Sequence, residues 1–127
     1  MPFTRWCPND PERRTFDTRF YLAEASPDAA MATVDETENV RLFWSTAQEV
    51  IDAADAGRVK IIFPTRRNLE RLAQYADFAE ARADADRFGA GLIEPWAETR
   101  DGVLHLCIAS DQGYPVTSEP LESAMRG

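Results

Sequence analysis

The sequence has few of the residues that build metal centres, disulfide frameworks or membrane spans. It contains one histidine, His105, and two cysteines, Cys7 and Cys107, near opposite ends of the chain with no Cys-x-x-Cys spacing. This inventory argues against a zinc site and permits a disulfide without indicating one. The longest apolar runs, such as residues 59–63 with Lys60 inside, are far shorter than the roughly 20 residues of a membrane-spanning helix, and no targeting signal is evident. We therefore expect a cytoplasmic protein with no membrane partner.

Lysine is almost absent from a chain that is acidic overall. Thirteen of the 14 basic residues are arginines, and 22 aspartates and glutamates give a formal net charge of −8. This charge opposes approach to nucleic acid, which is therefore not an expected partner. Arginines that converge in the fold would instead recognise phosphates or carboxylates through paired hydrogen bonds.

The length and composition fit one globular domain spanning residues 1–127. Hydrophobic residues make up 44% of the chain and charged residues 28%. Neither a Gly-x-Gly-x-x-Gly nor a Gly-x-x-x-x-Gly-Lys sequence occurs, which excludes the two familiar glycine-rich phosphate-binding loops.

The first third of the chain predicts loops and two strands. Three prolines interrupt residues 1–15, which we expect to form a loop. Apolar and polar residues alternate over 16–25 and again over 40–44, as in strands with one buried face. The intervening residues 26–37 carry no sustained period and predict a mobile loop.

The middle third predicts three helices. Thr46 and Glu49 form a capping box, and Gly57 ends that helix. Thr65 is expected to cap a second helix, and Asp77 with Glu80 to cap a third that ends at Gly89. The second helix is expected to turn an apolar stripe toward the core, made by Leu69, Leu72, Ala73 and Ala76.

The last third predicts strands at 92–93 and 103–109 around a turn at 100–102. From residue 110 we expect an ordered edge and then a loose tail, so that 110–127 is a loose C-terminal segment. The whole is an α+β domain with few strands for its helices, which suggests that part of the sheet is missing.

Two acidic groups are candidates for chemistry. Asp35, Glu36 and Glu38 lie within four positions and could hold Mg²⁺ or Mn²⁺ or supply a general base, although a solvated loop explains them as well. Glu80 and Asp84 share a helix face with interleaved arginines, which favours helix ion pairs over a metal site.

Arg66 and Arg67 near the start of the second helix form a plausible phosphate-binding pair, because helix N-termini attract anions. The alternative is a salt bridge with Glu70. The tryptophans are expected to anchor the core or loops, and His105 has no partners for a nucleophilic triad.

Four segments form an ordered series along the chain. They are Trp6-Cys7-Pro8 with residues 13–23 (RRTFDTRFYLA), residues 38–49 (ENVRLFWSTAQE), residues 61–72 (IIFPTRRNLERL), and residues 93–95 (IEP) continuing through Asp101-Gly102 to residues 111–115 (DQGYP). In this order they resemble bacterial Nudix hydrolases of the acyl-CoA-diphosphatase-like branch, over nearly the whole chain.

The resemblance implies a partial Nudix-type α/β/α sandwich with a mixed sheet and C-terminal helices. It also implies hydrolysis of a nucleotide pyrophosphate, such as a CoA derivative, with Mg²⁺ or Mn²⁺ assisting the attack of water. The family's Nudix box, a glycine and a glutamate followed by Arg-Glu-x-x-Glu-Glu-x-Gly, has no match in residues 1–127. The chain therefore resembles the part of the domain after the box, and no metal ligand is assigned in it.

The resemblance also suggests site residues. Glu38, six positions before Trp44, lies where several Nudix enzymes have an additional metal ligand or base, so it is the first catalytic candidate and Glu36 is the second. The substrate-binding candidates are three arginines at recurring positions of the branch: Arg19, Arg66 and Arg67.

Three hypotheses follow. The chain is the C-terminal part of a Nudix hydrolase and is catalytically deficient alone; or it is a non-catalytic Nudix scaffold that binds a nucleotide or a partner protein; or a homodimer or a box-containing partner completes it. Without the box helix, one side of the sheet would lose its cover and expose apolar surface, at a cost of about 25 cal/mol per Å². We therefore expect a free monomer to be marginally stable.

Overall fold

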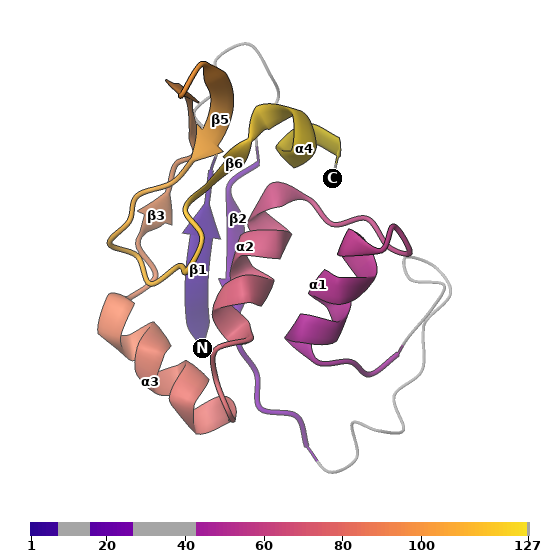
Figure 1. Ribbon diagram of the computed structural model, residues 1–127. Helices are drawn as coiled ribbons and strands as arrows, with labels where there is room; N and C mark the ends of the chain where they lie inside the picture. The colour runs from indigo at the N-terminus through magenta and orange to yellow at the C-terminus, as the bar shows by residue number, and fades with distance from the viewer. Residues whose placement is uncertain (8–15, 27–42, 127) are drawn as a thin grey trace.

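The computed structural model describes residues 1–7, 16–26 and 43–126, which combine helices and strands as expected for the α+β class (Figure 1). The elements are β1 (Pro2–Trp6), β2 (Thr18–Tyr21), α1 (Ala47–Asp55), α2 (Phe63–Leu72), α3 (Phe78–Phe88), β3 (Leu92–Ile93), β4 (Trp96–Arg100), β5 (Val103–Cys107), β6 (Ser118–Pro120) and α4 (Leu121–Arg126).

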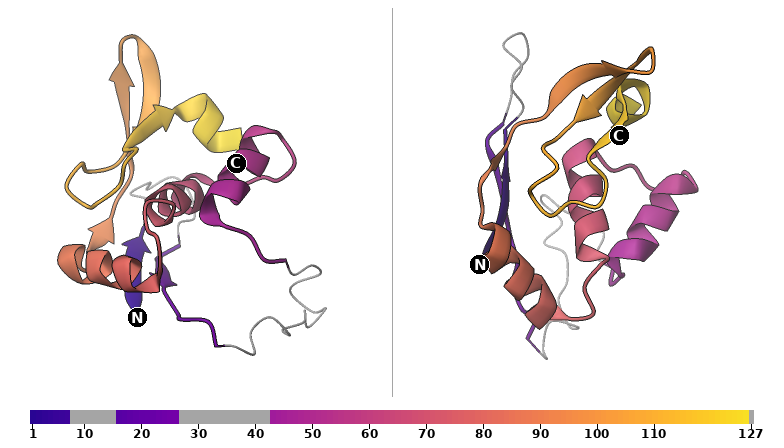
Figure 2. Two further views of the ribbon diagram at one scale, coloured as in Figure 1. Left: turned by 60° about the horizontal axis from the view of Figure 1, so that its bottom comes forward. Right: turned by 60° about the vertical axis from the view of Figure 1, so that its left-hand side comes forward.

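The strands form two small sheets. In the first, with order β2-β1-β3, β1 runs antiparallel to β2 and parallel to β3. In the second, with order β4-β5-β6, all neighbours are antiparallel. Helices α1 and α2 lie to one side of the first sheet, and no described helix packs against its other side (Figure 2, right).

The core lies between β1 and α2. Trp6 is 1% exposed, and its ring meets the rings of Phe63 and Tyr114 edge-on at centroid distances of 6.0 and 5.6 Å. The apolar cluster is completed by Ile93 of β3, Ile108 of the segment after β5 and Ala124 of α4. The core therefore joins elements from both ends of the chain.

The helix boundaries set by capping residues are as predicted. The Thr46 hydroxyl accepts from the Glu49 backbone N–H at 3.1 Å, and the Glu49 carboxylate accepts from the Thr46 backbone N–H, which completes the capping box of α1. The Asp77 carboxylate likewise accepts from the backbone N–H of Glu80 at the start of α3. Because each cap is decided within three residues, sequence alone identifies it.

Helix α2 corrects two predictions. It begins at Phe63 with Pro64 in its first turn, so Thr65 lies inside the helix and does not cap it. Proline suits this position because its missing N–H would be unpaired there anyway.

The buried face of α2 also differs from the predicted one: its buried residues are Phe63, Arg67, Asn68 and Arg71. The predicted stripe is only half-buried at Leu69 and Leu72, and Ala73 and Ala76 are exposed. Arg71 is buried because its guanidinium lies 4.3 Å from the Phe3 ring centroid and 3.0 Å from the Asp84 carboxylate. Both partners come from other elements, so the spacing of apolar residues along the helix does not predict them.

The two ends of the chain are more regular than predicted. Within the expected loop 1–15, residues Pro2–Trp6 form β1, and residues 8–15 lie outside the described part. A register shift between Pro2 and Thr4 lets both Phe3 and Thr4 be buried, which hides the alternation of a strand. At the other end β6 supplies the expected ordered edge, but α4 replaces the loose tail.

Of the other predicted strands, β2 lies within 16–25, and β3 and β5 lie within 92–93 and 103–109. The predicted strand 40–44 and loop 26–37 fall almost entirely outside the described residues; Phe43 and Trp44, which are described, are not in a strand.

Candidate functional site

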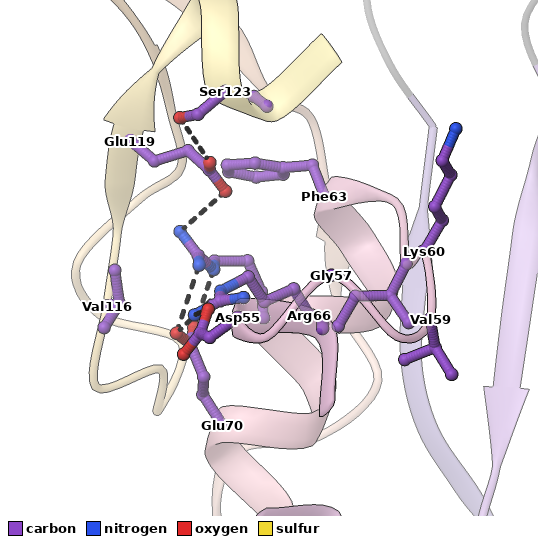
Figure 3. A pocket seen from close by; sticks show the side chains of 14 residues that line it. Asp55, Gly57, Val59, Lys60, Phe63, Arg66, Glu70, Val116, Glu119 and Ser123 are labelled. Carbon is purple, nitrogen blue, oxygen red and sulfur yellow. Dashed lines mark hydrogen bonds and ion pairs between the residues drawn. The ribbon is translucent and has the colours of Figure 1, made fainter. Parts of the chain in front are cut away.

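A pocket of about 650 Å³ opens between the α1–α2 connection, helix α2 and the β6–α4 segment (Figure 3). Two of the predicted substrate-binding residues, Arg66 and Arg67, line it. Its other charged and hydroxyl-bearing lining residues are Asp55, Lys60, Glu70, Glu119 and Ser123.

Arg67 is the central side chain of the pocket and is 2% exposed. Its Nε lies 2.7 Å from Glu70 Oε1 and its Nη2 donates to Glu70 Oε2 at 3.1 Å. On the other side its Nη1 lies 3.4 Å from Oε1 of Glu119, whose second oxygen accepts from the Ser123 hydroxyl at 2.8 Å. Arg67 thus links α2 to Glu119 of β6 and, through Glu119, to Ser123 of α4.

The hydrogen bonds of this cluster are incomplete. Arg67 Nε and Nη1 and Glu70 Oε1 are all buried, and none makes an aligned hydrogen bond with a described residue. The short Nε to Oε1 distance therefore reflects charge attraction with poor alignment. All three atoms are enclosed by the protein, so a bound group reaches Arg67 only if it displaces a neighbouring carboxylate.

Arg66 lies at the rim of the pocket and is tied to acidic neighbours. Its Nη2 lies 2.9 Å from Asp55 Oδ1, and its Nε lies 3.6 Å from Glu70 Oε2. The pair with Asp55 connects α2 to the end of α1, so Arg66 contributes to the packing of the two helices as well as to the pocket.

Three basic and three acidic side chains line the pocket, so its formal charges balance. Burial raises the pKa of the Glu70 carboxyl above its ordinary value, although Arg67 and Arg66 act in the opposite direction; the nearby Glu119 raises it further. Burial therefore outweighs ion pairing at Glu70. Any anion that enters the pocket must compete with Glu70 and Glu119 for the same guanidinium.

The predicted site residues are only partly brought together. Arg66 and Arg67 both line the pocket. Both also form salt bridges with Glu70, which was the predicted alternative to phosphate binding. The Arg19 side chain is 57% exposed on β2, 4.0 Å from Asp17, and does not line this pocket. The catalytic candidates Glu36 and Glu38, with the rest of the acidic cluster, lie outside the described residues.

No three His, Cys, Asp or Glu side chains gather to hold a metal ion within residues 1–7, 16–26 and 43–126.

The two α3 carboxylates singled out from the sequence accept hydrogen bonds from different partners. Asp84 accepts from Arg71 of α2, and Glu80 accepts from the Ala76 backbone N–H at 2.8 Å. Asp84 is therefore ion-paired, but its partner is Arg71 of α2 and not, as predicted, one of the interleaved arginines of its own helix. Both cysteines are free.

The three tryptophans differ in solvent exposure. Trp6 is a core residue, as predicted, whereas Trp44 and Trp96 are 63% and 41% exposed. His105 Nδ1 lies 2.9 Å from the Val103 carbonyl oxygen, and its ring is half-buried.

Sequence reasoning missed Glu119 and Ser123, which form the far wall of the pocket. Glu70 had a signal, because it lies three positions after Arg67 on one helix face. Glu119 is 52 positions from Arg67, and no local pattern marks it; only the pairing of β6 with β5 carries it to α2.

Comparison with protein-family models, with curated proteins and with solved structures finds no match to this chain. No helix in the described part of the chain is long and apolar enough to cross a membrane.

Proposed function

We propose that this chain is the C-terminal part of a Nudix-type hydrolase whose intact form cleaves nucleotide pyrophosphates, such as CoA derivatives, with Mg²⁺ or Mn²⁺. The proposal begins from the four ordered sequence segments that resemble that family. The structural observation that carries it is the open face of the sheet β2-β1-β3.

The open face is identified by strand register. Arg5 of β1 is paired with Arg19 of β2 on one side and with Leu92 of β3 on the other, so the three side chains share one face of the sheet. Leu92 is 41% exposed, and Tyr21, two residues from Arg19 on the same face, is 64% exposed. An α/β/α sandwich covers both faces of its sheet, so this half-covered sheet is what a part of such a domain would leave.

The described residues do not fit a catalytic metal centre, because they contain no suitable cluster of ligands. On our proposal the Nudix box supplies the carboxylates that hold the metal, and the chain alone does not hydrolyse pyrophosphates. Glu38 then acts as the chain's own base or additional ligand, with Glu36 as the second candidate.

Activity measurements on two polypeptides test the proposal. One is this chain; the other is the same chain extended by the in-frame sequence encoded upstream, if that sequence carries a Nudix box. With CoA and Mg²⁺ or Mn²⁺, only the extended polypeptide should release adenosine 3′,5′-bisphosphate.

Substitutions in the extended polypeptide test the role of Glu38. Glu38→Gln should lower kcat by roughly 10²-fold, whereas the exposed control Glu94→Gln should not lower it. Metal-dependent release by this chain alone, or an upstream frame without a box, would contradict the proposal.

A second candidate function is non-catalytic nucleotide binding in the pocket of Arg67. The observation that favours it is the pair of buried Arg67 donors without aligned acceptors, since phosphate oxygens are the acceptors that a guanidinium pairs with most readily. A bound pyrophosphate would displace Glu119, whose contact with Arg67 is the longer of the two.

Titration with ADP tests this candidate by amide NMR. Shifts should centre on Arg67 and Ser123, weaken in Arg66→Gln, and grow as acid neutralises Glu70. Unchanged spectra at about 1 mM ADP, a concentration that still detects weak binding, would reject it.

A further inference from the structure

Strand β4 is one edge of the sheet β4-β5-β6, and β5 is the only described strand that pairs with it. All five residues of β4 are exposed. The hairpin of β4 and β5 projects away from helices α1, α2 and α3 (Figure 2, left). An edge strand of this kind presents unpaired backbone N–H and C=O groups to another chain.

The hairpin turn decides which backbone groups of β4 point outward. Arg100 is paired with Val103 across the two-residue turn Asp101-Gly102, whose φ values of 51° and 78° suit a type I′ turn. The closing pair of such a turn is hydrogen-bonded, so Arg100, Glu98 and Trp96 direct their backbone groups toward β5. Ala97 and Thr99 therefore direct theirs toward the open edge.

We propose that β4 binds β4 of a second copy of this chain, antiparallel and with Thr99 on the two-fold axis. In this register Glu98 of each copy lies directly opposite Arg100 of the other, twice per dimer. These positions form non-hydrogen-bonded pairs, in which side chains approach most closely. In the single chain Arg100 Nε already donates to Glu98 at 2.8 Å, so association joins two ion pairs into one alternating set of four charges.

The other two-fold registers that use the outward groups are poorer. Centring the pairing on Glu98 places the two Glu98 carboxylates opposite each other, where like charges repel. Centring it on Ala97 places Pro95 opposite Thr99, and proline has no N–H to donate. The Glu98 register pairs both outward residues, Ala97 with Thr99 of the other copy, and is disfavoured by its central like charges alone. Charge therefore selects the Thr99 register over it, and the missing proline N–H disfavours the Ala97 register.

Two further features fit this register. It brings Trp96, which is 41% exposed, over the partner's turn at Gly102, where an added Cβ would meet no atom within 4 Å. In addition β4 pairs with β5 without a bulge and contains no lysine or proline, three features that would block edge pairing. Its two charged residues, Glu98 and Arg100, are the ones that this register places opposite each other.

Sedimentation velocity of the full chain from about 10 µM to about 1 mM tests the proposal, because a small interface gives a weak dimer. We expect a reversible monomer–dimer equilibrium. Thr99→Pro should raise the dissociation constant at least about 10-fold, since it removes an outward N–H while leaving the β5 pairing intact. Thr99→Val, which keeps that N–H, is the matched control, and circular dichroism checks that both variants fold.

Charge reversal tests the register itself. Glu98→Arg alone should weaken the dimer by about 10-fold, because it places an arginine opposite Arg100 of the other copy at two positions of the dimer. Adding Arg100→Glu should restore the dimer.

Cysteine cross-linking tests the same register. Thr99→Cys should form a disulfide between copies on oxidation, whereas Glu98→Cys should not. A monomer at every concentration, a dimer insensitive to Thr99→Pro, or a double reversal that fails to restore association would overturn the proposal. None of these outcomes depends on hydrolase activity.

Discussion

Tyr114 and Asn68, 46 residues apart in the chain, are joined inside the core by a hydrogen bond of 2.7 Å from the tyrosine hydroxyl to the Asn68 side-chain oxygen. The same hydroxyl accepts from Trp6 Nε1 at 3.3 Å, and Thr4 donates to the same Asn68 oxygen at 3.3 Å. Four polar side chains thus form one hydrogen-bonded chain where strand β1 meets helix α2, although the buried Asn68 Nδ2 has no partner among the described residues.

Replacing Tyr114 with phenylalanine should destabilise the fold by about 1–3 kcal/mol. The substitution keeps the ring but leaves the buried Trp6 N–H without its acceptor, and unmade buried hydrogen bonds carry this cost. Urea denaturation gives the free energy of unfolding. Tyr21→Phe is the control, because Tyr21 is 64% exposed and its replacement should change that free energy by less than about 0.5 kcal/mol.

Gly113→Ala should be more destabilising than Gly57→Ala. Both glycines have positive φ, at 87° and 77°, so both alanines carry backbone strain of about 1 kcal/mol. Only at Gly113 would the new Cβ lie 2.9 Å from carbon atoms of the Phe88 ring; at Gly57 it would meet nothing within 4 Å. Equal losses in thermal unfolding experiments would show that the Phe88 ring moves aside without cost.

Arg67→Met should lower the free energy of unfolding by about 3 kcal/mol, because it removes the cation that lies between two carboxylates in a buried cluster. Arg66→Met, at the rim, should cost less than about 1 kcal/mol. Chemical denaturation at neutral pH compares the two variants. Adding Glu70→Gln to Arg67→Met should recover part of the loss; if it does not, charge repulsion is not the cause.

The raised pKa of Glu70 predicts a specific pH dependence. The unfolded chain has the ordinary glutamate pKa of 4.5, and the folded chain has a higher pKa at Glu70. In the pH window between these two values, the folded chain holds the Glu70 proton more tightly than the unfolded chain does. The contribution of Glu70 to stability is therefore greatest at acid pH, falls as the pH rises through this window, and is constant above it.

Unfolding measurements between about pH 2.5 and 7, a range that includes the ordinary pKa values of both carboxyl types, isolate this contribution by difference between the parent chain and Glu70→Gln. Asp17 supplies the opposite control. Its hydrogen bond with Arg5 lowers its pKa, so its contribution is present above the ordinary carboxyl value and is lost as the pH falls. A difference of the same sign for Glu70→Gln and Asp17→Asn would contradict the assignment.

The elements that sequence predicted well are those decided by neighbouring residues. Thr46 and Asp77 cap their helices through hydrogen bonds that span three positions, and the Asp101-Gly102 turn needs only residues that accept positive φ. The burial of Arg71 was not predictable in this way. It depends on Phe3, Phe88 and Asp84, which come from other elements.

The pocket shows the same division. Three of its charged residues lie within five positions of one helix: Arg66, Arg67 and Glu70. Their proximity can therefore be predicted from the sequence. Glu119 reaches Arg67 only because the second sheet folds back over α2. The balance of charge around Arg67, which decides whether the pocket accepts an anion, therefore becomes visible only in three dimensions.

The contact between Trp6 and Tyr114 spans 108 positions, and this separation constrains how the protein is made. During synthesis the strand that carries Trp6 emerges before Tyr114, and the ring that completes its environment follows 108 residues later. Until then Phe3 and Trp6 remain uncovered, and such apolar segments are the ones that chaperones bind. We therefore expect the core to close only after Tyr114 has emerged, in a step whose rate is limited by long-range loop closure.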